Sequence, residues 1–166
     1  MDAQEIIKHF QLTEHPEGGH FKETYRSSIT IKSENLDHQF DGYRNLCTSI
    51  LFLLTSHKFS AFHKIKQDEI WHFYKGSTLK LHMISPEGDY TFKLIGPNFS
   101  LGEIPQYTVP ACWYFAAEVI APDSFSFVGC TVSPGFDFKD FTLPSCKELS
   151  KEFPKHKSII EKLTHH

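Results

Sequence analysis

The chain has 166 residues, 40% of them hydrophobic, which is enough for one folded domain with its own core. Its net charge of −3, with lysines and arginines scattered among the acids, gives no basic stripe for a nucleic-acid backbone, so we expect no nucleic-acid partner. No segment approaches the roughly 18 apolar residues of a membrane-spanning helix, and the N-terminus shows no signal-peptide pattern. The four cysteines form no CxxC pair, so we expect a cytoplasmic protein with free thiols and no membrane partner.

The first third of the chain predicts a helix followed by strands. Residues 2–10 place apolar side chains at helical spacing, and the HPEGG sequence at 15–19 ends any helix. Residues 20–31 are rich in Thr, Tyr, Ile and Phe and predict one long strand. Residues 33–46 are polar and predict a surface loop, whereas the nearly continuous apolar run at 47–56 predicts a strand buried on both faces.

The second half of the chain predicts further strands and few helices. Residues 79–95 alternate apolar and polar side chains around a Ser-Pro-Glu-Gly-Asp turn, which predicts a hairpin. Proline and glycine residues separate further short strands, which we expect at 103–108, 113–118, 125–131 and 138–143. Regularly spaced strands without intervening helices indicate a sandwich or a barrel.

Helical character returns after Pro144. Ser145 and Glu148 have the spacing of a capping box, and an apolar stripe follows, so we expect a helix over 145–163 that packs outside the barrel. The whole chain therefore predicts one all-β domain spanning residues 1–166. Its barrel covers about 18–143, and short helices lie at both ends.

Residues 63–76 resemble the first sequence motif of the cupin superfamily. His63, Glu69 and Gly76 fall in register with that motif, while Ile65 takes the place of its second histidine. The second cupin motif has its best match at 109–115, where Phe115 falls at the position of the last metal-binding histidine. Two of the four usual ligands are therefore missing. Because a stable first-row metal site needs three or four protein ligands, we expect no metal and no other cofactor.

Three segments together resemble a branch of single-domain cupins of unknown function. They are residues 15–26 (HPEGGHFKETYR), 69–76 (EIWHFYKG) and 133–141 (SPGFDFKDF), and the resemblance extends over about residues 4–147. It implies a cupin double-stranded β-helix, or jelly-roll barrel, that forms a homodimer. The resemblance implies no particular reaction.

A looser similarity concerns the N-terminal strand. Residues 18–24 (GGHFKET) resemble that strand of the dTDP-4-keto-6-deoxyglucose 3,5-epimerases, which share the cupin fold and use a barrel histidine as a base. The resemblance makes His63 the counterpart of that base. However, Gly18 stands where those enzymes have an arginine, so a phosphate-binding group is missing and a nucleotide-sugar substrate is in doubt.

His63 and Glu69 are the candidate catalytic residues. If both face the barrel interior, the carboxylate can hydrogen-bond the imidazole, orient it and raise its basicity, which would make His63 a general base. The alternative is that the two residues remain from a lost metal site and only fix each other. Along a regular strand, Glu69, Trp71 and Phe73 share one face, so His72 would point the other way.

The candidate ligand-binding residues are aromatic or charged. Aromatic side chains could line a pocket for a sugar, a base or a small aromatic compound, although packing in the core is the alternative for most of them. Charged residues of the N-terminal strand could close the barrel mouth or cross a dimer interface, or they could form an exposed strand pair. The candidates are Glu23, Arg26, Trp71, His72, Phe73, Trp113 and Phe115.

The sequence favours a metal-independent cupin that binds a small polar or aromatic metabolite, with isomerase or epimerase chemistry carried by His63. Two other hypotheses stay open. The first is a non-catalytic ligand-binding or sensory module in which His63 and Glu69 only hold the ligand. The second is a metal-dependent enzyme in which His72 or His82 completes the ligand set.

Overall fold

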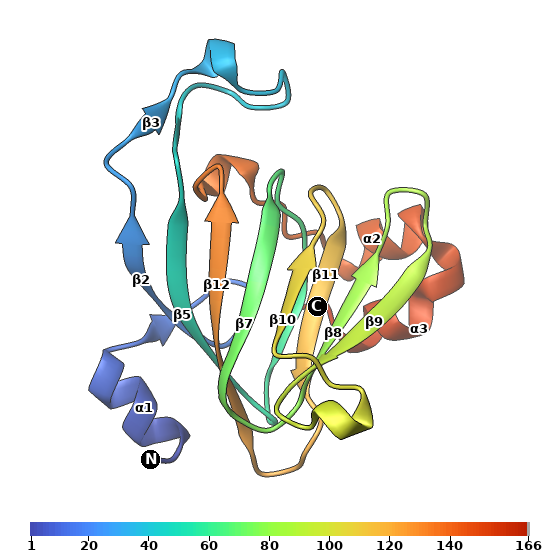
Figure 1. Ribbon diagram of the computed structural model, residues 1–166. Coiled ribbons are helices and arrows are strands. Elements are labelled where there is room, and N and C mark those ends of the chain that lie inside the picture. The colour runs from blue at the N-terminus through green and yellow to red at the C-terminus, as the bar shows by residue number, and fades with distance from the viewer. Residues whose placement is uncertain (166) are drawn as a thin grey trace.

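The computed structural model describes residues 1–165 as a barrel of two antiparallel sheets with short helices at both ends (Figure 1). The larger sheet has, in spatial order, β1 (Thr13–Glu14), β2 (His20–Arg26), β5 (Thr48–Thr55), β12 (Phe125–Ser133), β7 (Asp68–Gly76) and β10 (Gln106–Val109). The smaller sheet has β6 (Phe59–His63), β11 (Tyr114–Val119), β8 (Leu79–Ile84) and β9 (Tyr90–Ile95). This arrangement confirms the predicted jelly-roll barrel.

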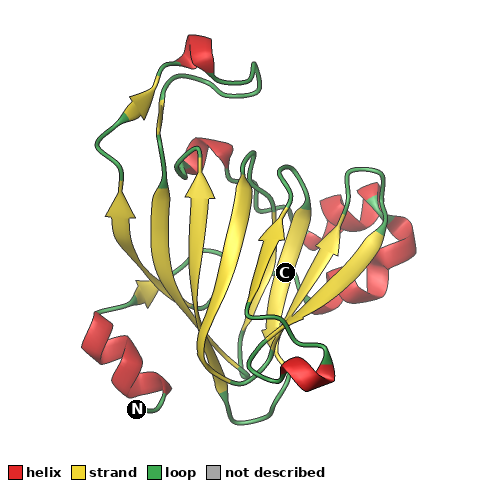
Figure 2. Ribbon diagram, in the orientation of Figure 1, coloured by secondary structure: helices red, strands yellow, loops and turns green. Residues whose placement is uncertain are grey.

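The core lies between the two sheets because the strands of both alternate apolar side chains toward the interior. The predicted hairpin is present as β8 and β9, with Leu79 paired to Ile95 and Ile84 to Tyr90. The side chains that fill the interior come from both sheets and include Phe52, Leu54, Trp71, Leu81, Phe115 and Val128. The core therefore occupies the middle of the barrel shown in yellow in Figure 2.

The N-terminal helix begins at a capping box. In α1 (Ala3–Phe10), Asp2 accepts a hydrogen bond from the backbone of Glu5, whose carboxylate accepts from the backbone of Asp2. Its apolar side packs on the larger sheet through Ile6 and Leu53. No helix of the described part of the chain, residues 1–165, is long and apolar enough to cross a membrane.

The predicted C-terminal helix is divided into two. It forms α2 (Cys146–Glu152), a 3₁₀ turn η4 (Pro154–His156) and α3 (Lys157–Lys162). The division falls at Pro154, because proline has no backbone N–H to donate and disfavours helical backbone in the residue before it. Both pieces cover the outside of the smaller sheet, where Leu149 and Ile160 pack with Phe62 and Ile84.

Two other segments differ from the sequence prediction. The expected long strand stops at Arg26, and β3 (Thr30–Ile31) pairs with β4 (Arg44–Asn45) in an arm, residues 27–46, that extends beyond the larger sheet (Figure 1). The expected strand at 138–143 is instead a 3₁₀ turn, η3 (Phe138–Asp140). Its first turn is capped by Asp137, whose side chain accepts from the backbone N–H of Lys139.

Candidate functional site

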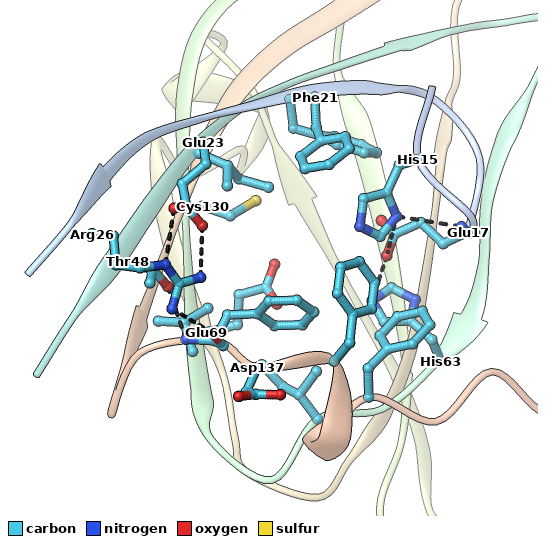
Figure 3. Close-up of a pocket in the computed structure, with 17 residues that line it drawn as sticks. His15, Glu17, Phe21, Glu23, Arg26, Thr48, His63, Glu69, Cys130 and Asp137 are labelled. Carbon is cyan, nitrogen blue, oxygen red and sulfur yellow. Dashed lines mark hydrogen bonds and ion pairs between the residues drawn. The ribbon is translucent and has the colours of Figure 1, made fainter. Parts of the chain in front are cut away.

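A cavity of about 320 Å³ opens into the barrel on the side of β2, β5 and β12 (Figure 3). This volume is within the range of small-molecule sites in proteins. Its lining residues come from the 15–19 turn, the inner faces of both sheets and the segment 136–141. They are His15, Glu17, Phe21, Glu23, Arg26, Thr48, Ile50, Phe52, His63, Ile65, Glu69, Cys130, Val132, Phe136, Asp137, Phe138 and Phe141.

His63 ends β6 and uses both ring nitrogens. Nδ1 lies 2.7 Å from the carbonyl oxygen of Ala61, and Nε2 lies 3.0 Å from Oε2 of Glu17. Because a carbonyl oxygen only accepts, Nδ1 must carry a proton. An ionised Glu17 facing an unprotonated Nε2 at 3.0 Å would be repelled by its lone pair. One of the two groups must therefore hold a proton, as an imidazolium or as a carboxylic acid, and the contact is close enough for that proton to pass between them.

Glu17 is positioned by the glycine-rich turn that precedes β2. Its backbone carbonyl accepts from the N–H of Ala61 at 2.7 Å, and its Oε1 accepts from the hydroxyl of Ser60 at 2.9 Å. Gly18 has a φ of +113°, and any Cβ there would collide with the carbonyl oxygen of Phe59. The turn therefore requires glycine at position 18 in order to bring Glu17 against β6.

Burial decides where the shared proton resides. It raises the pKa of Glu17 above its ordinary value, although His15 and the Ser60 hydrogen bond act in the opposite direction. It also lowers the pKa of His63, against the favourable charge of Glu69 and the hydrogen bond to Ala61. Both shifts favour the neutral forms of the two side chains.

Glu69 lies between these residues and the opposite wall of the cavity (Figure 3). Burial raises the pKa of its carboxyl to about 7; the charge of His63 lowers the pKa and that of Glu17 raises it. Within residues 1–165, the expected hydrogen bond between His63 and Glu69 is not formed; His63 instead makes an ion-pair contact with Glu17 at 3.0 Å, and Glu69 acts on His63 through its charge. At neutral pH, Glu69 is close to half ionised.

Glu23 and Arg26 line the other side of the cavity, on β2. The guanidinium of Arg26 donates to both carboxylate oxygens of Glu23, at 2.9 and 2.7 Å. It also donates to the Asn45 side chain at 2.8 Å and to the carbonyl oxygen of Phe136 at 3.1 Å. Arg26 therefore joins β2 to the arm and to the segment 136–141, and its charge is already paired.

The aromatic wall of the cavity is not the predicted one. Its rings belong to Phe21, Phe52, Phe136, Phe138 and Phe141, whereas Trp71, Phe73, Trp113 and Phe115 lie in or against the core instead. Trp71 and Phe115 are both 1% exposed and pack edge to face, with their ring centroids 6.3 Å apart. Phe115 still supports the site, because its ring packs 4.1 Å from that of His63.

Two candidate histidines lie outside the cavity. His72 points to the opposite face of β7, as alternation predicts, and contacts Thr131 at 3.0 Å and Gln106 at 2.9 Å. His82 is buried beneath α3, 2.8 Å from the Tyr90 hydroxyl and 3.2 Å from Glu118. Neither histidine is placed to complete a metal site with His63 and Glu69.

The donor set was tested against the metal centre that the cupin motifs suggest. Of the four motif positions, Ile65 and Phe115 are apolar and buried, which leaves His63 and Glu69. Within residues 1–165, no group of three or more histidine, cysteine, aspartate or glutamate side chains is arranged to hold a metal ion. These residues do not fit a metal centre.

Sequence reasoning missed several residues of the site. His15 and Glu17 belong to the HPEGG sequence, and Phe136, Phe138 and Phe141 belong to the PGFDFKDF sequence. Both segments carry the resemblance to the cupin branch, but neither contains a motif position that predicts a functional role. One feature of the sequence could have indicated them. The two segments are distant in sequence, yet both carry the family resemblance together with the residues around Glu69.

A jelly-roll barrel with an interior cavity, and with His63 and Glu69 at two motif positions, defines a cupin. The chain belongs to the cupin superfamily, in the branch described as DUF985 (Cupin_5), whose profile matches residues 4–144. It is 32% identical over 148 residues to the uncharacterized protein YML079W of Saccharomyces cerevisiae, covering 84% of this chain and 73% of that protein.

Two solved structures show the same architecture. The crystal structure of protein SO0799 from Shewanella oneidensis has a TM-score of 0.88 and 39% identity, covering 99% of this chain and 98% of that one. A hypothetical protein from Leishmania major has a TM-score of 0.90 and 32% identity over all of both chains. These relatives establish the family and the fold.

Proposed function

We propose that this cupin binds a small polar or aromatic metabolite in its cavity and moves protons on it without a metal, as an isomerase or epimerase does. The proton shared between Glu17 and His63, with the ionisable Glu69 beside it, carries this proposal. General acid–base catalysis is most efficient when the pKa of the group lies near the working pH. Glu69 meets that condition because of its burial.

Glu69 and the Glu17–His63 pair have different roles in the proposed proton transfer. Glu69 in its ionised form removes a proton from carbon, and the Glu17–His63 pair supplies its shared proton to the oxygen or carbon that becomes negative. The protons return in the second half of the reaction, so the ligand is isomerised with no net gain or loss of atoms. Phe115 and Phe141 hold the His63 ring in place, with ring centroids 4.1 and 5.4 Å away.

Exchange of carbon-bound hydrogen tests this function. A panel of small ketoses, amino ketones and aromatic ketones is incubated with the protein in D₂O and followed by NMR. We expect exchange with at least one compound, and a rate lower by about 100-fold or more in His63→Ala and Glu69→Gln, because each removes one proton-transfer group. His72→Ala is the matched control, since its imidazole lies outside the cavity.

The opposite result identifies the alternative. If no compound exchanges and His63→Ala weakens ligand binding, the chain is a non-catalytic binding or sensory module. Stoichiometric metal in protein purified without chelators, lost in His63→Ala, would instead support the metal-dependent reading. Each outcome contradicts the metal-independent isomerase.

We further propose that the chain forms a homodimer through β2 and the arm, residues 27–46. Large apolar side chains are exposed there, including Tyr25, Ile29 and Tyr43, the last with 67% of its surface exposed. Sedimentation should give twice the mass of one chain, and Ile29→Glu combined with Tyr43→Glu should give the monomer mass. Phe92→Glu, on exposed β9, is the control. A monomeric wild-type mass would refute the dimer.

We place the protein in the cytoplasm, because all four cysteines are free thiols.

A further inference from the structure

Glu69 differs from the other acidic side chains of the cavity in having no strong hydrogen-bond donor. Its side chain is buried, with 8% of the residue exposed, and its carboxyl reaches the cavity. The Trp71 indole N–H and the Cys130 thiol both lower the pKa of Glu69 as neighbouring donors. Within residues 1–165, however, the indole nitrogen lies outside good hydrogen-bonding geometry, and a thiol is a weak donor. By contrast, Glu17 is bonded to Ser60 and lies 3.0 Å from His63, and Glu23 is bonded to Arg26.

The charged groups around the cavity leave a deficit of positive charge. The lining contains four carboxyl groups, those of Glu17, Glu23, Glu69 and Asp137, and a single guanidinium, that of Arg26. Arg26 is committed to Glu23 by two hydrogen bonds. The two histidines add no positive charge, because burial lowers the pKa of both His15 and His63. An anionic ligand would find no unpaired cation here.

The remaining wall favours a cation for a second reason. Five phenylalanine rings line the space, and the face of an aromatic ring carries negative charge that attracts a nearby cation. The same rings can cover the apolar part of a small ligand. The cavity thus provides both parts of a site for an amphipathic cation. The Glu69 carboxylate, which has no charged partner, can bind the cationic group, and the phenylalanine rings can bind the apolar part.

We propose that the ligand of this cavity carries an ammonium group, which donates to Glu69, while its apolar part lies among the phenylalanine rings. The inference rests on the cavity being the ligand site, as proposed above, and it does not require that the ligand be turned over. It narrows the ligand class from small polar or aromatic metabolites to amines and excludes acids.

Three probes that differ in charge test this inference. Benzylamine, benzyl alcohol and benzoate have similar shapes and are small enough for a cavity of about 320 Å³. Binding to the full chain is measured at pH 8 by calorimetry and NMR. We expect benzylamine to bind about tenfold more tightly than benzyl alcohol, because the ammonium group adds the attraction of opposite charges to its hydrogen bond with the Glu69 carboxylate, and benzoate to bind more weakly than both because its charge repels that carboxylate.

The variant Glu69→Gln keeps the shape of the side chain and removes its charge. It should weaken benzylamine binding about tenfold and leave benzyl alcohol binding unchanged, which also shows that the variant is folded. Glu14→Gln is the matched control, because Glu14 is an exposed carboxylate outside the cavity lining. Its affinities for all three probes should equal those of the wild type.

The inference is overturned if benzyl alcohol or benzoate binds as tightly as benzylamine, or if none of the three binds. It is also overturned if Glu69→Gln keeps the preference for the amine. The wild-type comparison alone decides the matter if the variant does not fold. The proposed function fails separately, when no carbon-bound hydrogen exchanges even though benzylamine binds with the expected preference.

Discussion

Replacing Arg44 with alanine is expected to lower the free energy of unfolding by about 3 kcal/mol, because a buried carboxylate loses its bidentate partner and keeps only the more distant charge of Lys66, 3.7 Å away. The guanidinium of Arg44 donates to both oxygens of Asp140 at 2.7 Å, and both residues are 2% exposed. Burial raises the pKa of Asp140, but hydrogen bonds from Arg44 and Gln67 outweigh it and hold that pKa below its ordinary value. Chemical denaturation of the variant at neutral pH measures the loss.

Two further variants distinguish a buried ion pair from general damage. Arg44→Met combined with Asp140→Leu should recover most of the lost stability, because no isolated charge remains in the interior. Lys58→Ala removes an exposed pair with Glu14 and should cost less than about 1 kcal/mol. A loss below 1 kcal/mol in Arg44→Ala would contradict the expectation.

The Arg44–Asp140 pair also connects the fold to the cavity. Arg44 belongs to the arm, whereas Asp140 ends η3, the turn whose neighbours Asp137, Phe138 and Phe141 line the cavity. The same variant should therefore weaken ligand binding, because part of the cavity wall loses its anchor.

The barrel could be predicted because its strands obey local rules. The run at 47–56 is nearly continuously apolar, and the hairpin at 79–95 alternates apolar and polar residues. Each pattern predicts a strand directly. The segment 138–143 has a similar composition but forms a turn, since the interaction that fixes it, Asp140 with Arg44, joins residues 96 positions apart. Such a contact leaves no periodicity in the sequence.

The site was harder to predict for the same reason. His63 and Glu69 were identified from their spacing, and alternation placed His72 on the other face of β7. Glu17, however, reaches His63 only because Gly18 lets the preceding turn approach β6 closely. Whether a core aromatic residue also lines the cavity depends on how the two sheets close: Phe52 and Trp71 both belong to the core, but only Phe52 of the two reaches the cavity.

Glu69→Gln should stabilise the protein at pH 8 by on the order of 3 kcal/mol relative to the wild type. The pKa of Glu69 rises from 4.5 to about 7 on folding, so the folded wild type binds its proton more tightly than the unfolded chain. The stability that the protonated Glu69 side chain contributes to the folded state is fully present below pH 4.5 and is lost as the pH rises through about 7. Glutamine does not titrate and avoids this loss.

The difference in unfolding free energy between variant and wild type should therefore be small at pH 4, grow between pH 4.5 and 7 and then level off. Denaturation midpoints across that range measure it, and Glu14→Gln should show no such trend. A difference that does not change with pH, or a variant less stable at pH 8, would contradict the burial of an unpaired carboxylate. A gain in stability would show that Glu69 destabilises the empty protein, as expected of a charge kept for a ligand. Saturating benzylamine should narrow the difference by about 1.4 kcal/mol without reversing it, because the wild type binds the amine about tenfold more tightly.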